Sequence, residues 1–179
     1  MYIDPLYIIL VLPAVILAMI AQIGVRSTFS KYSKIASSRR ITGEDAARAV
    51  LRANGVTGVR FEYVAGELTD HYDPKTNTIR LSGDVGGASS IAAIGVAAHE
   101  AGHAVQHAKG YAPIKLRMAI IPLTNIGSML AFPLILIGLL IEVTELAYLG
   151  IAFFGLSTVF QLVTLPVELN ASKRAVQAI

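Results

Sequence analysis

Two histidines and a glutamate near the middle of the chain have types and spacing suited to metal chemistry. His99 and His103 are four residues apart, and Glu100 directly follows the first of them. Residues four apart on an α-helix lie on one face, so both imidazoles can reach one metal ion. The neighbouring carboxylate can then reach a water on that ion. This H-E-x-x-H pattern is typical of catalytic zinc sites, although a pattern with three fixed positions also arises by chance.

A catalytic zinc ion takes three protein ligands and keeps one position for water. His107 continues the four-residue spacing, but an uninterrupted helix carries it about 5.4 Å beyond His103 along the axis. Peptidases that use a later histidine break the helix at a glycine, where this chain has Gln106, and Lys109 stands where that histidine would be. We therefore expect His107 beside the site or on the surface. His71 precedes a turn and fits a strand end or loop better than a ligand.

The composition is that of a membrane protein. Of the 179 residues 54% are hydrophobic and 15% are charged, and the mean hydropathy of +0.61 is too high for a soluble domain of this size. The chain has no cysteine, so histidine and carboxylate must hold any zinc. A net charge of +3 and a pI near 9.3 would suit nucleic acid, but the positions of the basic residues favour a membrane, and no nucleic-acid partner is expected.

Three uncharged stretches are long enough to cross a bilayer, which takes about 20 helical residues. They cover residues 5–25, 118–141 and 146–167. No basic residue precedes the first stretch, so a membrane anchor is favoured over a cleavable signal peptide. We predict a transmembrane helix in residues 1–25 and a transmembrane hairpin in residues 118–167. A buried hairpin of a soluble protein is the alternative for the latter, and its length disfavours it.

The charges predict which side of the membrane each segment faces. All lysines and arginines lie in two segments, 26–117 and 173–174. The charges of the other connections are acidic, namely Asp4, Glu142 and Glu145. The positive-inside rule then places the N-terminus outside and residues 26–117 in the cytoplasm. A basic cluster would lie against anionic lipid headgroups: Arg26, Lys31, Lys34, Arg39 and Arg40.

The cytoplasmic segment is expected to be a small α+β domain. Its predicted elements are a helix over 41–54, a strand over 59–64, a turn at 73–77, a strand over 79–82, a flexible loop over 83–87 and the helix that carries His99. Thr42 is expected to cap the first helix, and Ser89 or Ser90 the second. The fold class is therefore a zincin-like core, a metal-binding helix with a small sheet, embedded in an α-helical membrane protein with three transmembrane helices.

An edge strand that precedes the metal-binding helix of a zincin pairs with the substrate backbone. In this chain we assign that role to the strand formed by Ile79, Arg80, Leu81 and Ser82. A purely structural role for this strand is equally compatible with the sequence.

Glu168 is the better candidate for the third ligand. It follows the third apolar stretch directly and opens a segment with Ala and Ser at helical spacings. Because the chain leaves the cytoplasm through one span and returns through the next, Glu168 emerges on the side of His99 and His103. A charge that only marks the end of a span is the alternative. We expect one Zn²⁺ per chain, held by His99, His103 and Glu168. Glu100 is expected to act as the general base.

With these residues, nearly the whole chain resembles the YugP-like family of bacterial membrane zinc metallopeptidases. The resemblance rests on residues 68–74 (LTDHYDP), 80–82 (RLS), 90–106 (SIAAIGVAAHEAGHAVQ) and 165–168 (LPVE). It implies zinc and proteolysis in a bacterial cell membrane, but no particular substrate. Family members continue with more hydrophobic sequence, so we expect residues 168–179 to be a cytoplasmic helix that is truncated here.

The chain is more distantly similar to the membrane-bound gluzincins. In those proteins the ligand glutamate is followed by Ala three residues later and by Asp four residues later. Ala171 matches, but Ser172 stands in the place of the aspartate, which leaves open the group that orients the ligands. The donor for the oxyanion is also open, since Arg174 fits an interfacial charge better than a catalytic role.

The sequence thus predicts a membrane-anchored zinc endopeptidase that cleaves protein or peptide substrates near the cytoplasmic face. An intramembrane protease is disfavoured, because that class needs an aspartate ligand from a later span and no aspartate follows Asp84. A non-catalytic, zinc-stabilised scaffold or adaptor is the other alternative, and Glu100 argues against it. Membrane-protein partners or a homo-oligomer are compatible with either function.

Overall fold

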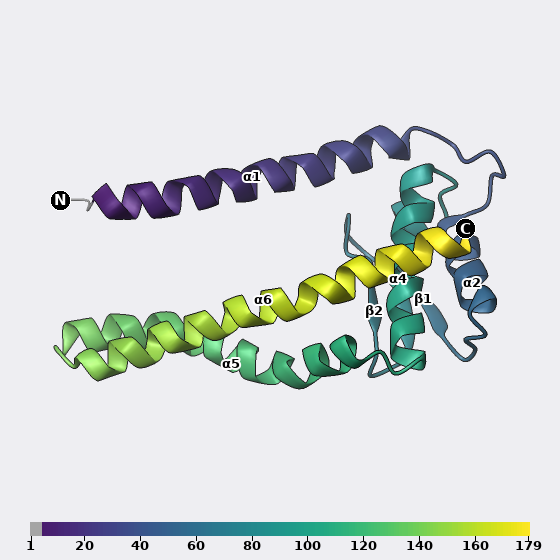
Figure 1. The fold of residues 1–179 in the computed structure, drawn as a ribbon. Coiled ribbons are helices and arrows are strands. Elements are labelled where there is room, and N and C mark those ends of the chain that lie inside the picture. The colour runs from purple at the N-terminus through teal and green to yellow at the C-terminus, as the bar shows by residue number, and fades with distance from the viewer. Residues whose placement is uncertain (1–4) are drawn as a thin grey trace.

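Long apolar helices dominate the fold, and a small sheet lies at one end of them (Figure 1). The computed structural model describes residues 5–179, so the predicted outer segment with Asp4 lies outside the described residues. The elements are, in chain order, α1 (Pro5–Ser33), α2 (Gly43–Ala53), β1 (Arg60–Val64), β2 (His71–Asp73), β3 (Thr78–Ser82), α3 (Gly83–Gly86), α4 (Ile91–Ala108), α5 (Ala112–Leu140) and α6 (Thr144–Ala178).

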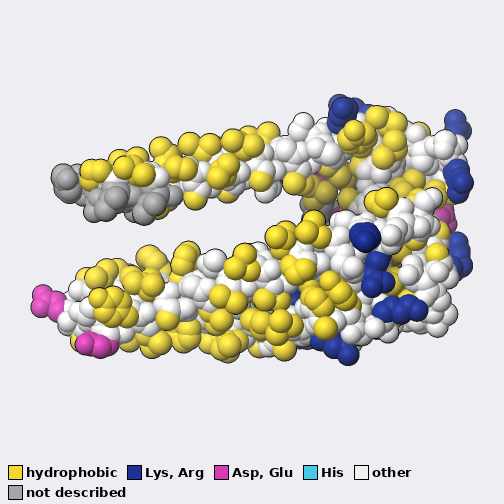
Figure 2. Space-filling view, viewed as in Figure 1, with side chains coloured by type: hydrophobic (Ala, Val, Ile, Leu, Met, Phe, Trp, Pro, Cys, Tyr) yellow, Lys and Arg dark blue, Asp and Glu magenta, His cyan; other side chains and the backbone are white. Residues whose placement is uncertain are grey.

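Three of the helices are long and apolar enough to cross a membrane, as predicted. They are Val11–Ser33 within α1, Ala112–Leu140 and Thr144–Ala178. Few of their side chains are buried inside the protein, which suits surfaces that face lipid. Figure 2 shows apolar side chains along all three, basic side chains at the end that carries the sheet, and acidic ones at the opposite end of the α5–α6 hairpin.

The α5–α6 hairpin packs through small residues. A Cβ added at Gly150 would lie 2.7 Å from the carbonyl oxygen of Ala131, and one at Gly138 would lie 2.6 Å from the nitrogen of Ala147. Such close approach of two backbones is typical of helices that associate in a membrane. α6 continues unbroken to Ala178, so no separate helix begins at residue 168, and Glu168 lies inside one long helix.

The sheet has the strand order β1-β3-β2, with β1 parallel and β2 antiparallel to β3. The assignment of Ile79–Ser82 as an edge strand is therefore wrong. β3 is paired with β1 along its whole length and with β2 over Thr78–Arg80, and the backbone N–H of Ser82 donates to Asp70 Oδ1 at 2.7 Å. With both sides occupied, β3 cannot accept a substrate strand. The edge nearest α4 is β2.

Helices α2 and α4 form the core with the sheet. Thr42 caps α2 as predicted, in a capping box with Asp45. Ser90 caps α4, where its hydroxyl accepts from the N–H of Ala93 at 3.2 Å. The buried side of α4 is rich in alanine, which lets α2, β3 and α6 approach closely; its buried apolar residues are Ala93, Ala97, Ala98, Ala101, Ala104 and Val105.

The segment over 83–87 differs from the flexible loop that the sequence predicted. Residues Gly83–Gly86 form the single helical turn α3. Val85 is fully buried within the core, so this glycine-rich turn is held by packing. It joins the central strand β3 to the N-terminus of α4 and thereby fixes where that helix begins.

Candidate metal centre

Helices α4 and α6 cross closely at the candidate metal centre. Gly102 lies at the crossing, and a Cβ there would be 2.5 Å from the carbonyl oxygen of Ala171. Real Cβ atoms essentially never come so near, so the crossing requires glycine at this position. Because Gly102 adjoins His103 and Ala171 lies three residues after Glu168, this contact sets how near the glutamate comes to the histidines.

Two imidazoles and one carboxylate converge at this crossing. Glu168 Oε2 lies 3.1 Å from His99 Nε2 and 3.3 Å from His103 Nε2, and the possible ligand atoms of all three lie within 4.8 Å of one another. Tetrahedral zinc with bonds of 2.0–2.1 Å separates its ligand atoms by about 3.3 Å. The two nitrogen–oxygen separations match this value, and a donor set of two nitrogens and one oxygen suits Zn²⁺. Among residues 5–179, these three side chains make the one such cluster.

Gln106 fixes the orientation of His103. It is fully buried, and its Nε2 donates to the carbonyl oxygen of Val167 at 2.7 Å and to Asn170 Oδ1 at 3.0 Å. Its Oε1 must then accept the proton of His103 Nδ1, 3.1 Å away. The other ring nitrogen of His103, Nε2, faces Glu168 Oε2 at 3.3 Å. Either a proton or a metal ion can lie between these two atoms, and in the neutral imidazole Nε2 has a lone pair available for a metal ion.

Ser172 answers the question that the gluzincin resemblance left open. Its hydroxyl lies 3.0 Å from His99 Nδ1, at the position where those proteins have aspartate. A hydroxyl can orient the ring of His99 but adds no negative charge. The sequence marked Ser172 as a departure, whereas the role of Gln106 had no local signal because its partners lie 61 and 64 residues away.

Glu100 lies beside the cluster and is held by strand β2. Its Oε2 accepts a hydrogen bond from the backbone N–H of Tyr72 at 3.0 Å. Burial raises the pKa of Glu100 above its ordinary value, although the nearby His103 and His99 oppose this shift. A carboxylate with a raised pKa is better matched to accepting a proton near neutral pH.

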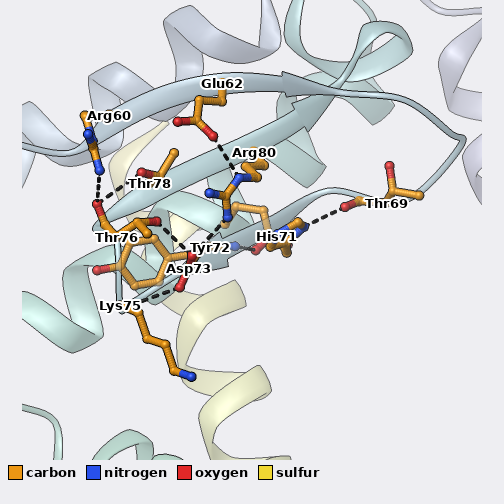
Figure 3. A network of polar contacts seen from close by, with 11 residues as sticks. Arg60, Glu62, Thr69, His71, Tyr72, Asp73, Lys75, Thr76, Thr78 and Arg80 are labelled. Carbon is orange, nitrogen blue, oxygen red and sulfur yellow. Dashed lines mark hydrogen bonds and ion pairs between the residues drawn. The ribbon is translucent and has the colours of Figure 1, made fainter.

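A polar network keeps β2 in place (Figure 3). Arg80 on β3 donates to Glu62 on β1 at 2.8 Å and to Asp73 on β2 at 3.0 Å, so one guanidinium ties all three strands together. Hydrogen bonds from Thr76, Arg80 and Lys75 lower the pKa of Asp73, which therefore stays ionised.

The two remaining histidines lie outside the cluster. His107 Nδ1 lies 3.1 Å from the hydroxyl of Tyr72 and so supports β2 from α4. His71 begins β2, and its Nδ1 lies 2.8 Å from the carbonyl oxygen of Thr69. Arg174 is turned away as well, because its Nε donates to Asn170 Oδ1 at 2.7 Å and its guanidinium lies over the ring of Tyr111.

Arg117, near the start of α5, is another residue of the site that the sequence did not indicate. Its Nη1 donates to Glu168 Oε1 at 3.1 Å. In the sequence it reads as one more basic residue at the end of a span. Only the fold of the hairpin shows that it faces Glu168.

Two cavities meet at His99 and Glu100. One of about 480 Å³ is mostly apolar and lies between the N-terminal half of α4 and the end of α6. The other, of about 300 Å³, lies between β2 and α5 and is lined by Tyr72, Arg117 and Glu168 among others. Together the two cavities leave space on both sides of Glu100 for an extended peptide.

Over the described residues 5–179 these features define a class of protein: a mostly helical protein with a small sheet, three helices of membrane-spanning length and one candidate zinc centre. Residues 7–179 match the model of the family described as "Putative neutral zinc metallopeptidase". The chain is also 47% identical over 174 residues, 97% of this chain and 77% of the relative, to "Putative membrane protease YugP" of Bacillus subtilis (strain 168). No solved structure matches it.

The chain therefore belongs to this family of YugP-like zinc metallopeptidases, as the sequence motifs predicted. The relative from Bacillus subtilis is named a membrane protease, and three helices of the present chain are long and apolar enough to span a bilayer. It is a membrane protein.

Proposed function

We propose that the protein is a membrane-anchored, zinc-dependent endopeptidase with a zincin-like catalytic core. The observation that carries this proposal is the convergence of His99, His103 and Glu168, with Glu100 beside them in a cavity. The first three would hold the metal through two nitrogens and one oxygen. When bound, Zn²⁺ would acidify water and polarise the scissile carbonyl.

The chain's own groups account for the proton transfers. Glu100 takes a proton from the attacking water and later passes it to the amine of the leaving peptide. The N–H of Tyr72 holds one oxygen of the Glu100 carboxylate, so the other oxygen is available for this exchange. Since burial raises the pKa of Glu100, its carboxyl group is a weaker acid than an ordinary glutamic acid and holds the proton more firmly between the two steps.

We place the substrate along the outer edge of β2 instead of along Ile79–Ser82; the N–H of Tyr72 on this edge is engaged by Glu100, so pairing there would use the carbonyl oxygen of Tyr72. The N–H of Tyr72 points away from β3, because it donates to Glu100 on α4. This edge therefore faces the cavity that contains the site, which is lined by Asp70, His71, Tyr72 and Pro74. An extended peptide there would run past Glu100 and reach the apolar cavity beyond it.

We infer that the site faces the cytoplasm in a multi-pass protein of the cell membrane. The candidate metal centre lies where α4 and α6 cross, at the end of the helices that carries the sheet (Figure 1). Basic side chains gather at this end, and acidic ones occupy the opposite end of the α5–α6 hairpin (Figure 2). Positive charge on the cytoplasmic side is the general rule for such helices. The segment between α1 and α5 would then be the cytoplasmic metallopeptidase domain.

Hydrolysis of an unfolded protein by the purified chain in detergent tests this function. We expect cleavage that a chelator abolishes and added Zn²⁺ restores. Glu100→Gln should bind zinc and lose hydrolysis, whereas Glu67→Gln, which changes an exposed carboxylate, should keep both. Zinc binding without any cleavage by the native protein would favour the scaffold or adaptor function instead.

A further inference from the structure

Arg117 brings a third helix into the metal centre. It lies near the start of α5, faces the smaller cavity, and donates from Nη1 to Glu168 Oε1 at 3.1 Å. We propose that Arg117 is a positioning residue, which holds Glu168 so that a single oxygen, Oε2, is offered to the metal. This inference rests on the zinc site of the proposed function.

The two oxygens of Glu168 have different partners. Oε2 lies 3.1 Å from His99 Nε2 and 3.3 Å from His103 Nε2, so it is the atom aimed at the shared ligand position. Oε1 is engaged by Arg117 on the other side. A carboxylate can bind a cation through one oxygen or through both. A hydrogen bond that holds Oε1 favours the single-oxygen mode and so keeps a position for water.

The guanidinium is placed for this contact and for little else. Among residues 5–179, Glu168 is the hydrogen-bond partner found for Arg117, and its buried Nε has none. The charge of Arg117 also offsets the repulsion between Glu168 and the neighbouring carboxylate of Glu100.

Zinc affinity, measured by competition with a chromogenic chelator, tests this role without relying on activity. We expect Arg117→Met to weaken zinc binding by about 10- to 100-fold, the usual effect of removing a group that orients a ligand. Lys115→Met is the matched control, because it removes an exposed positive charge from the same turn of α5. It should leave zinc affinity unchanged.

A double-mutant cycle separates positioning from a merely structural role. If Arg117 acts through the carboxylate of Glu168, Arg117→Met should have no further effect on zinc affinity in a Glu168→Gln background. In the single variant, Co²⁺ bound in place of zinc should show weaker visible absorption, because the freed Oε1 raises the coordination number. If Arg117→Met does not fold, Arg117→Lys is measured in its place. Because lysine keeps the positive charge and a donor, Arg117→Lys should keep the zinc affinity and the Co²⁺ spectrum close to those of the native protein.

Equal zinc affinity and equal Co²⁺ spectra for Arg117→Met and Lys115→Met would overturn the proposal. So would a full additional loss of affinity in the Glu168→Gln background. Failure of the proposed function gives a different result, since the native protein itself would then bind no zinc or cleave nothing.

Discussion

Replacement of Gly102 by alanine tests how the crossing of α4 and α6 sets the metal centre. The new Cβ would lie 2.5 Å from the carbonyl oxygen of Ala171, 3.0 Å from its carbonyl carbon and 3.1 Å from its Cα. All three are backbone atoms, so no side chain can turn aside. An ordinary contact begins near 3.4 Å. The helices must therefore separate by roughly 0.5–1 Å, on the scale at which misplaced groups lose about 100-fold in activity.

Two energetic effects of this change oppose each other. Overpacking of a close contact costs about 1–3 kcal/mol, whereas alanine in a helix is better than glycine by up to about 1 kcal/mol. We therefore expect a loss of up to about 2 kcal/mol in the free energy of unfolding. Metal sites tolerate shifts of only about 0.2 Å, so zinc affinity should fall by about 10- to 100-fold.

Gly95→Ala provides the control for this experiment. It makes the same change on the same helix, where a Cβ meets nothing within 4 Å. Melting in detergent and chelator competition should show Gly95→Ala as no less stable than the native protein and unchanged in zinc affinity. If Gly102→Ala binds zinc as tightly as Gly95→Ala, the close crossing does not position Glu168 and the reasoning is refuted.

Two further predictions concern groups around the centre. Gln106→Leu removes the acceptor for His103 Nδ1, so zinc binding should weaken by about 10- to 100-fold. Gln177→Leu changes an exposed glutamine and should leave zinc affinity unchanged. Equal affinities of the two variants in the chelator assay would contradict the role of Gln106. In the proposed mechanism Glu100 must be deprotonated to act as the base, and burial raises its pKa, so kcat/KM should fall with decreasing pH through a pKa above the ordinary glutamate range. The pH profile is measured with a peptide substrate. If kcat/KM falls through a pKa in the ordinary glutamate range, burial does not raise the pKa of Glu100 in the working enzyme.

The convergence of His99, His103 and Glu168 could be anticipated from local rules. A four-residue spacing places two imidazoles on one helix face, and the charge distribution returns residue 168 to the same side of the membrane. Both rules depend on periodicity and composition, which a single sequence shows directly. The caps Thr42 and Ser90 were predictable for the same reason.

The contacts between elements could not be read in this way. β2 is only three residues long, too short to show alternation, and its pairing with β3 made β3 a central strand. Arg117 meets Glu168 because α5 and α6 fold back as a hairpin, and Gln106 reaches Val167 because Gly102 lets two helices touch. These depend on crossing angles and close approach, which leave no local pattern.

X-ray absorption at the zinc edge of the zinc-loaded protein shows whether His99, His103 and Glu168 hold one ion. We expect two imidazole nitrogens at about 2.0–2.1 Å together with oxygen ligands, and a changed oxygen shell in Glu168→Gln. A third imidazole, or a spectrum that Glu168→Gln leaves unaltered, would contradict this ligand set.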